Sequence, residues 1–522
     1  MARNTTLTVI TLALISALSV AFFSFYYLAA FHSDGAAIQV LARSSAGENS
    51  LLPRNFNYGN QLILFRANLP IALFLKMGWT GYGAFTAGSS LNILFYLSLS
   101  VLAINSVIGR WPLALGLGIA ALFPIGVEDA DYLIGQQSHL ANVCFAIIIV
   151  TQIYRLLGNA GRWPILFAAL PVFCMASESP ARAVLILVPL LLVVASTLRI
   201  GRTILAGVVL GVPLVAGYFV NAYLVELRHV VGLTELVPAT ATEIVANVRT
   251  LLAMIWSDYF GSGEFQVTND APFYLPFTGL KILFILGALL FLMQLCATLR
   301  QSLQTVPFSL PQAAGFFFLV GFCGLVVGMS ATALLIKTPD IRHFLWSLEI
   351  CKLGFYMIGW HLLERRLNGK TAAAVLCLTV VGLSTPVASF LYAPNRALLK
   401  QLAEQQYASP PRQAFTDQMA RLGVHTVFGN DFWQMLRLEV LFPPAEAGVL
   451  GAWEGKIYYA NWLTRPSLRC ASGTVLYLLG RGEVDQKIVT LVQQNGGVAL
   501  LQTGDETLYA APPVWEQTGC PT

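Results

Sequence analysis

A carboxylate follows the first apolar segment of the sequence directly. The residues His32, Ser33, Asp34 and Gly35 come at the end of the apolar stretch 7–31. A carboxyl group at the edge of a membrane is partly desolvated, which raises its basicity and suits Asp34 to removing a proton from a hydroxyl group. His32 is a pocket candidate beside it. The alternative is a helix end marked by polar residues without a chemical role.

Three acids stand within four residues at a second position. Glu128, Asp129 and Asp131 repel one another, so a cation, a metal ion or a raised pKa must compensate them. Their hard oxygen atoms would suit a divalent metal such as Mg or Mn. Gln137 and His139 follow and could line the same pocket. The alternative is a solvated loop, and no metal-spaced Cys/His set accompanies the acids.

Cationic residues open two apolar segments. Arg342 and His343 precede one of them, where a guanidinium group and the free N–H groups of a helix start could bind a phosphate. Glu178 and Arg182 flank the start of another and could pair with each other. The alternative for Arg342 is an interfacial side chain that extends towards water.

Two further charges lie inside an apolar segment. Glu349 and Lys352 are three residues apart and so share one helix face. Charges in lipid are costly and usually paired. We therefore interpret them as a neutralising pair rather than as a binding site.

The composition indicates what must position these residues. Of the 522 residues, 56% are hydrophobic and 11% are charged, with a mean hydropathy of +0.68, whereas soluble domains contain about 25% charged residues. A cytosolic enzyme is excluded. Membrane spans need roughly 20 apolar residues, and the sequence contains eleven candidates: 7–31, 84–108, 111–127, 139–157, 163–177, 182–198, 203–224, 277–299, 312–336, 342–363 and 371–393.

The loops between these spans segregate by charge. One set holds ten basic residues against one acid, and the other holds thirteen of the fifteen acids in residues 1–393. By the positive-inside rule the basic side is cytoplasmic, and so is the N-terminus. The loops 32–83, 128–138 and 225–276 then face outwards. Basic residues form no patch, so no nucleic acid partner is expected.

Residues 394–522 differ from the rest, because they carry 21 of the 57 charges. Short apolar runs at 426–429, 456–462, 474–479, 488–492 and 498–502 predict strands, and helices are expected near 395–407 and 413–422. We expect a mainly α polytopic bundle at 1–393, followed in the chain by a small periplasmic α/β or α+β domain at 394–522. Cys470 and Cys520 lie in this domain and could pair if the compartment is oxidising.

The arrangement of these pieces resembles the GT-C class of membrane glycosyltransferases. In that class an acid in the first outer loop, matched here by Asp34, stands just after the first helix. Further acids lie in the second outer loop, and an Arg that opens a late helix contacts the carrier phosphate. Arg342-His343-Phe344-Leu345 is similar to that segment, although His replaces the usual Tyr and the following Pro is missing.

The resemblance implies transfer of a sugar from a polyprenyl-phosphate carrier to a periplasmic glycan, lipid or protein, with inversion. Asp34 would be the general base, and Arg342, with His343 and Arg182, would stabilise the leaving phosphate. The bond to phosphate is already activated, and the sequence has no Walker or Rossmann glycine loop, which argues against ATP or NAD as cofactor. The implied location is the bacterial inner membrane, with membrane lipid as a further partner.

Three alternatives remain at this point. An O-antigen ligase or polymerase also acts on polyprenyl-linked sugars, but it usually places its large outer loop between late helices. A transporter or flippase would favour two similar halves and broken helices at the midplane, neither of which the sequence contains. The third alternative is an assembly protein whose outer domain binds partners.

Overall fold

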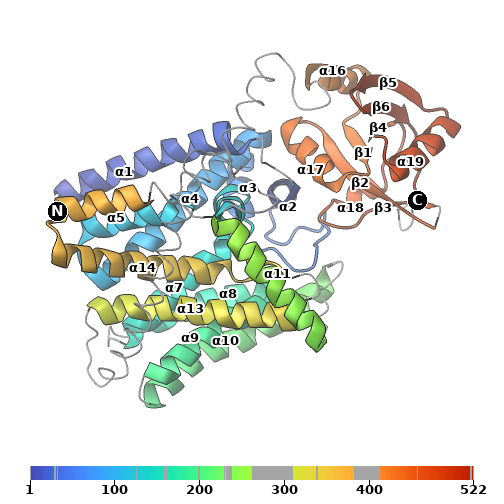
Figure 1. Cartoon of the computed structure of the whole chain (residues 1–522). Coiled ribbons are helices and arrows are strands. Elements are labelled where there is room, and N and C mark those ends of the chain that lie inside the picture. Colours follow the sequence, from blue (N-terminus) through green and yellow to red (C-terminus); the bar gives the residue numbers. More distant parts are fainter. Residues whose placement is uncertain are drawn as a thin grey trace. The chain divides into compact units, whose positions relative to one another are not determined.

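The computed structural model describes residues 2–28, 31, 33–124, 126–157, 163–197, 200–228, 230, 238–260, 310–336, 339–380, 412–454, 456–517 and 520. The chain divides into two compact units. The helical unit comprises Met1–Ala17, Asn92–Glu226 and Thr234–Phe390, and the sheet unit comprises Leu18–Leu91, Leu227–Leu233 and Leu391–Thr522 (Figure 1). The first outer loop thus groups with the C-terminal domain, and the domain boundary expected at 393/394 stays a prediction.

The helical unit is built from long apolar helices and a few short helical turns. They are α1 (Ala2–Ala21, shared with the other unit), α4 (Gly81–Ile108, likewise shared), α5 (Trp111–Leu122), α6 (Val127–Asp129), η2 (Ala130–Gly135), α7 (Leu140–Leu157), α8 (Trp163–Glu178), α9 (Pro180–Thr197), α10 (Ile200–Leu227), α11 (Ala241–Phe260), α13 (Leu310–Leu335), η3 (Ile341–His343) and α14 (Leu345–Arg366). The expected span 277–299 lies outside the described residues, as does 381–393 of the last span.

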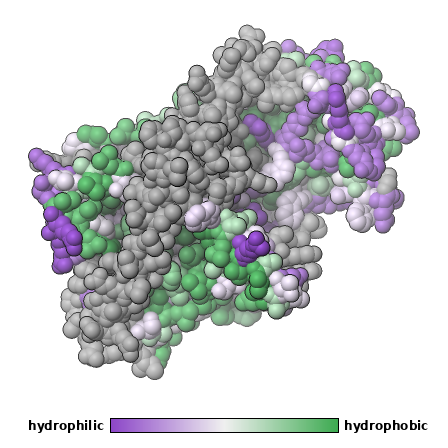
Figure 2. Space-filling model, viewed as in Figure 1, coloured by the Kyte–Doolittle hydropathy of each residue, from purple (hydrophilic) through white to green (hydrophobic). Residues whose placement is uncertain are grey.

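Apolar helices place the protein in a membrane. Among the described residues, five helices are long and apolar enough to cross one, and four shorter apolar helices accompany them. Their outer faces carry large hydrophobic side chains in contact with the surroundings, such as Val212 at 65% and Phe219 at 66% exposure on α10. In Figure 2 hydrophobic residues cover much of the visible helical unit, whereas hydrophilic residues predominate on the sheet domain. The mainly helical, polytopic fold with a small C-terminal sheet domain is confirmed.

Small residues allow α13 and α14 to approach closely. A Cβ atom on Gly321 of α13 would lie 2.5 Å from the backbone nitrogen of Cys351, and one on Gly354 of α14 would lie 2.6 Å from that of Phe318. Helices in lipid associate mainly through such close van der Waals contact, since lipid tails are as apolar as the side chains. This packing fixes α14, which carries Glu349 and Lys352.

The sheet unit contains a six-stranded mixed sheet of order β3-β2-β1-β4-β6-β5. Its strands β1, β2 and β4 are parallel, and the outer pairs are antiparallel. Their bounds are β1 (Thr426–Gly429), β2 (Glu446–Trp453), β3 (Lys456–Tyr459), β4 (Val475–Leu479), β5 (Val498–Thr503) and β6 (Glu506–Ala511). The helices of the unit are η1 (Phe22–Tyr27), α2 (Ser33–Glu48), α3 (Asn68–Lys76), α16 (Arg412–Leu422), α17 (Phe432–Leu441), α18 (Pro466–Arg469) and α19 (Glu483–Gln494).

Both faces of the sheet are covered. On β4, Leu476 and Leu478 pack with α17, whereas Tyr477 and Leu479 pack with α19 on the opposite face. Successive side chains of a strand point to opposite faces, so a central strand covered on both sides is apolar throughout, as β4 is. The strand expected at 474–479 is confirmed, although its pattern is continuously apolar and not alternating.

One expected strand is wrong. Residues 488–492 belong to α19, an amphipathic helix in which Ile488 and Val492 are fully buried. Their spacing of four places them on one helix face. The run was too short to separate helix from strand by periodicity. The helix expected near 395–407 lies outside the described residues, and the strands β2 and β6 were not predicted.

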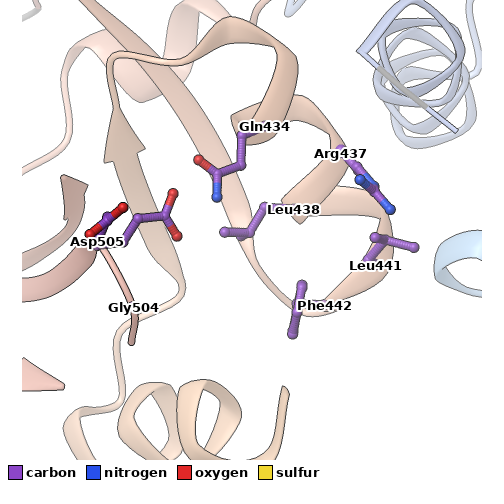
Figure 3. Close-up of a pocket in the computed structure, with 8 residues that line it drawn as sticks. Gln434, Arg437, Leu438, Leu441, Phe442, Gly504 and Asp505 are labelled. Atoms are coloured by element: carbon purple, nitrogen blue, oxygen red, sulfur yellow. The ribbon is translucent and has the colours of Figure 1, made fainter. Parts of the chain in front are cut away.

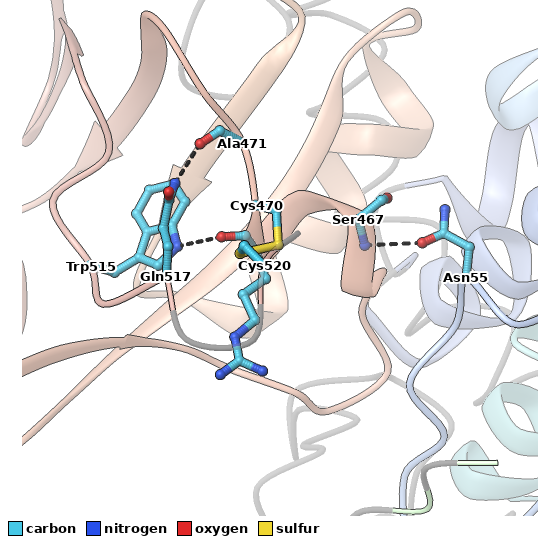
Figure 4. Close-up of a disulfide and its surroundings, with 8 residues drawn as sticks. Asn55, Ser467, Cys470, Ala471, Trp515, Gln517 and Cys520 are labelled. Carbon is cyan, nitrogen blue, oxygen red and sulfur yellow. Dashed lines mark hydrogen bonds between the residues drawn. A yellow bond between two sulfur atoms is a disulfide. The ribbon is translucent and has the colours of Figure 1, made fainter. Parts of the chain in front are cut away.

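A disulfide joins Cys470 to Cys520, fifty residues apart. Around it, the Trp515 indole Nε1 donates to the Arg469 carbonyl oxygen at 2.9 Å, and Gln517 donates to the carbonyl oxygen of Ala471 (Figure 4). Trp515 also packs on Phe428 of β1, with ring centroids 4.2 Å apart. The C-terminal segment is thereby held against the sheet on the α19 side.

Removing this disulfide should destabilise the sheet domain. Replacing Cys470 and Cys520 by serine is expected to lower its stability by about 2–4 kcal/mol, because the cross-link limits the unfolded chain. The measurement is pulse proteolysis of the full chain in detergent across a urea titration, with cleavage within 471–517 as the readout. Cys377→Ser, which removes an exposed free cysteine, is the control. Equal midpoints for the two proteins would contradict the expectation.

Candidate functional site

The acidic turn of the helical unit consists of α6 and η2, where the sequence predicted a loop. Asp129 is 2% exposed, and its Oδ2 atom lies 3.6 Å from the ammonium group of Lys352. Asp131 instead accepts a hydrogen bond from the Gln136 side chain at 2.7 Å. The acids of this turn thus contact different partners. Among the described residues no group of three or more His, Cys, Asp or Glu side chains is placed to hold a metal ion. The divalent site at this turn stays a prediction.

Lys352 also binds Glu349, at 2.7 Å. The Tyr96 hydroxyl of α4 donates to the other oxygen of Glu349, and all of these side chains are buried. The neutralising pair expected from the spacing on α14 is present. Asp129 joins it from 220 residues away, so one ammonium group ties the acidic turn to α14.

The end of η2 is held by amide groups. Gln137 has a left-handed backbone (φ 59°); its side chain donates to the Ile134 carbonyl oxygen at 3.3 Å and accepts from Asn92 at 2.9 Å. His139 follows and packs edge-on against the ring of Tyr132, 5.5 Å between centroids. Gln137 and His139 are both buried, so they support the turn.

Arg342 lies against the same tyrosine. Its guanidinium group stands over the Tyr132 ring at 5.8 Å and binds Asp340 at 3.0 Å. Asp340 also caps η3 by accepting from the Arg342 backbone N–H at 2.9 Å. The position of Arg342 is therefore fixed by a cap, an ion pair and an aromatic ring, while its side chain keeps 39% exposure.

His343 joins this cluster. Since α14 begins at Leu345, His343 precedes that helix and belongs to η3. Burial, together with the neighbouring guanidinium groups of Arg182 and Arg342, lowers the pKa of His343 to about 3. His343 is therefore neutral at physiological pH. The structure brings together the three residues that were predicted to bind the donor phosphate.

Tyr132 belongs to η2, so it is the residue of the acidic turn that contacts Arg342. The sequence analysis did not single it out. Burial and the nearby carboxyl groups of Asp340 and Glu128 raise the pKa of Tyr132 above its usual value. The phenol stays protonated and is available as a hydrogen-bond donor. The only feature of the sequence that could have indicated this role is the position of Tyr132 directly after Asp131.

Glu178 ends α8 and is 4% exposed. Asn221 of α10 donates to the carbonyl oxygens of Ser177 and Glu178 at 3.0 and 3.1 Å. This bond fixes the short connection to α9, which carries Arg182. Glu178 is thus a buried residue at the helix junction beside the cationic cluster.

Asp34 belongs to the sheet unit. It lies in the first turn of α2 and is half-buried, where the free N–H groups and the positive end of the helix favour a carboxylate. His32 lies outside the described residues. The structure thus gathers the predicted residues of the helical unit, and it places Asp34 at the start of a helix of the other unit.

The sheet unit also contains a cavity of about 350 Å³ between α17 and the β5–β6 turn. Gln434 and Leu438 point from the helix towards Asp505 (Figure 3). None of the residues predicted for chemistry lines this cavity, so we assign it no part in the reaction.

The fold matches solved structures. The chain is similar to the crystal structure of ArnT from Cupriavidus metallidurans bound to undecaprenyl phosphate, with a TM-score of 0.54 and 10% identity over 95% of this chain and 97% of that one. The apo structure of ArnT gives a TM-score of 0.49 and 14% identity, over 97% and 98% of the two chains. No protein-family model matches, and neither does any curated protein. The protein therefore has the fold of ArnT, which confirms the expected GT-C-type fold.

Removing the Lys352 ammonium group tests the buried network. Lys352→Met should destabilise the protein by about 3–5 kcal/mol, since breaking a buried pair leaves its carboxylates without a cation. Arg110→Gln is the control, because the Arg110–Glu364 pair is exposed and such pairs contribute little. Thermal unfolding in detergent is the measurement. A loss no larger than that of the control would contradict a structural role for the network.

Proposed function

We propose that the protein is a membrane glycosyltransferase that takes a sugar from a polyprenyl-phosphate carrier. The observation that carries this proposal is the gathering of Arg342, His343 and Arg182 beside Tyr132. Two guanidinium groups and a protonated phenol suit a phosphate ester. The shared fold supports it further, because the ArnT crystal structure holds undecaprenyl phosphate.

The proposed chemistry is an inverting displacement. The Asp34 carboxylate accepts the proton of the acceptor hydroxyl group while its oxygen forms a bond to the anomeric carbon. The bond between that carbon and the phosphate oxygen breaks on the opposite side, and polyprenyl phosphate leaves. Arg342 and Arg182 stabilise the charge that grows on the phosphate, while neutral His343 can donate one hydrogen bond.

The proposal includes an outward-facing reaction. We place the protein in the bacterial inner membrane, with a cytoplasmic N-terminus and a periplasmic C-terminal domain that includes residues 394–522. The Cys470–Cys520 disulfide supports this side, since disulfides persist in oxidising compartments. The acceptor is a glycan, lipid or protein. No step passes through a metal. Whether Mg or Mn binds at Glu128, Asp129 and Asp131 is tested by adding EDTA to the transfer assay.

Arg342→Gln tests phosphate binding. We expect undecaprenyl phosphate to bind about 10- to 100-fold more weakly, because a hydrogen bond to a charged group contributes about 1.5–3 kcal/mol. Arg155→Gln, which replaces an exposed arginine near the end of α7, is the matched control. The measurement is a binding titration with the protein in detergent micelles. Equal affinities for both variants would exclude Arg342 from the phosphate site.

Asp34→Asn tests the general base. Transfer from a polyprenyl-phosphate sugar should fall about 10²- to 10⁴-fold, the usual contribution of such a base, with undecaprenyl phosphate binding retained. Asp417→Asn, an exposed aspartate of α16, should leave transfer unchanged. Release of polyprenyl phosphate by the Asp34→Asn protein at the normal rate would rule out this role. Donor binding without turnover by the native protein would favour a transporter instead.

A further inference from the structure

Four charged side chains join α2 to the C-terminal domain within the sheet unit. Arg465 binds Glu439 and Glu446, at 3.0 Å each. Arg43 of α2 approaches the same two carboxylates, at 3.3 Å from Glu439 and 3.7 Å from Glu446. The side chains of Glu439 and Arg465 are 2% and 7% exposed. The positive and negative charges balance, and we refer to these four residues as the α2 clamp.

Further hydrogen bonds fix the clamp to the backbone. The second oxygen of Glu439 accepts from the Ala447 N–H at the start of β2, at 2.9 Å. Arg43 donates to the Ala445 carbonyl oxygen at 3.4 Å. Glu439 of α17 is therefore bound to β2, to Arg465 and to α2 at the same time. These bonds fix the direction in which its carboxylate points.

The clamp continues on both sides of Arg43. Towards the start of α2, Gln39 donates to the Gly81 carbonyl oxygen at 2.6 Å. Gly81 has φ +54°, and a Cβ atom there would lie 2.8 Å from the Val440 carbonyl oxygen. Only glycine fits this contact with α17. The N-terminal half of α2 is thereby held through the first residue of α4.

Beyond α2, the following segment is bound to the other side of the domain. Asn57 donates through its backbone to the Thr464 carbonyl oxygen at 2.7 Å. The Asn55 side chain accepts from the Ser467 N–H of α18 at 3.0 Å (Figure 4). The contacts therefore extend from residue 39 to residue 57.

These contacts specify orientation more than they add stability. A buried ion cluster contributes little net free energy compared with apolar residues of the same volume, and α17 already packs against α2. An apolar contact alone would allow α2 to rotate or slide. The clamp fixes one rotation, and Asp34 stands nine residues before Arg43 on the same helix, about 14 Å along its axis.

We propose that Arg43, Glu439 and Arg465 are positioning residues, through which the C-terminal domain holds α2 and orients Asp34. This inference rests on the proposed role of Asp34. A misplacement of about 1 Å can cost about 10²-fold in rate. The proposal thus gives the C-terminal domain a part in the chemistry although it contributes no reacting group.

Arg43→Gln in the full chain tests this proposal, with Arg54→Gln as the control. Arg54 is an exposed arginine of the segment that follows α2. In the Arg43→Gln protein, Arg465 still neutralises one of the two glutamates, so the domain should remain folded. We expect kcat for transfer to fall about 10- to 100-fold, with KM for the polyprenyl-phosphate sugar unchanged. Arg43→Lys, which keeps the charge, should recover part of kcat.

Hydrogen exchange measured by mass spectrometry provides a readout that is independent of activity. In Arg43→Gln, peptides covering 33–48 should exchange faster, while peptides of β1, β4 and α19 should exchange as in the native chain. Faster exchange across the whole sheet would overturn the proposal, because Arg43 would then stabilise the domain. Native kcat together with unchanged exchange at 33–48 would also overturn it. If the native protein catalyses no transfer, the proposed function is refuted. The exchange result would still show whether Arg43 holds α2.

Discussion

Both units depend on one constraint: a charged side chain can be buried only beside a partner of opposite charge. In an apolar chain each buried ionised group needs a counter-charge within a few ångströms, because its hydration is lost. Lys352 lies between Glu349 and Asp129 in the helical unit, and Glu439 lies between Arg43 and Arg465 in the sheet unit. Each cluster joins segments that are distant in the sequence, and those segments carry the candidate residues.

The two clusters differ in what they connect. The Lys352 cluster attaches the acidic turn to α14, and the turn carries Tyr132, over which Arg342 stands. The α2 clamp attaches the helix that begins with Asp34 to a sheet domain cross-linked by a disulfide. The backbone hydrogen bonds of a helix keep its residues in fixed relation to one another. In both cases, a buried ion pair on a helix therefore also fixes the position of a residue near the start of that helix.

The sequence predicted the features that depend on local pattern. Hydropathy predicted the apolar helices, the three-residue spacing of Glu349 and Lys352 predicted their pair, and a short apolar run predicted β4. Features that depend on distant partners were not predictable. Nothing near Asp129 indicates Lys352, and nothing near Arg43 indicates Glu439, because these contacts form only when the helices pack. The error at 488–492 has a different origin, since five apolar-rich residues fit a strand and a helix face equally well.

The distribution of the candidate residues between two units has a consequence for the proposed reaction. Arg342, His343 and Arg182 belong to the helical unit, and Asp34 to the sheet unit. Phosphate binding then depends on η3, η2 and the start of α9, whereas proton removal depends on α2 and on the domain that clamps it. A substitution in the Lys352 cluster should therefore weaken phosphate binding, whereas a substitution of Arg43 should slow proton removal. In the proposed reaction, binding of the carrier and the rate of the chemical step should therefore be separable, because each would depend on its own buried ion cluster.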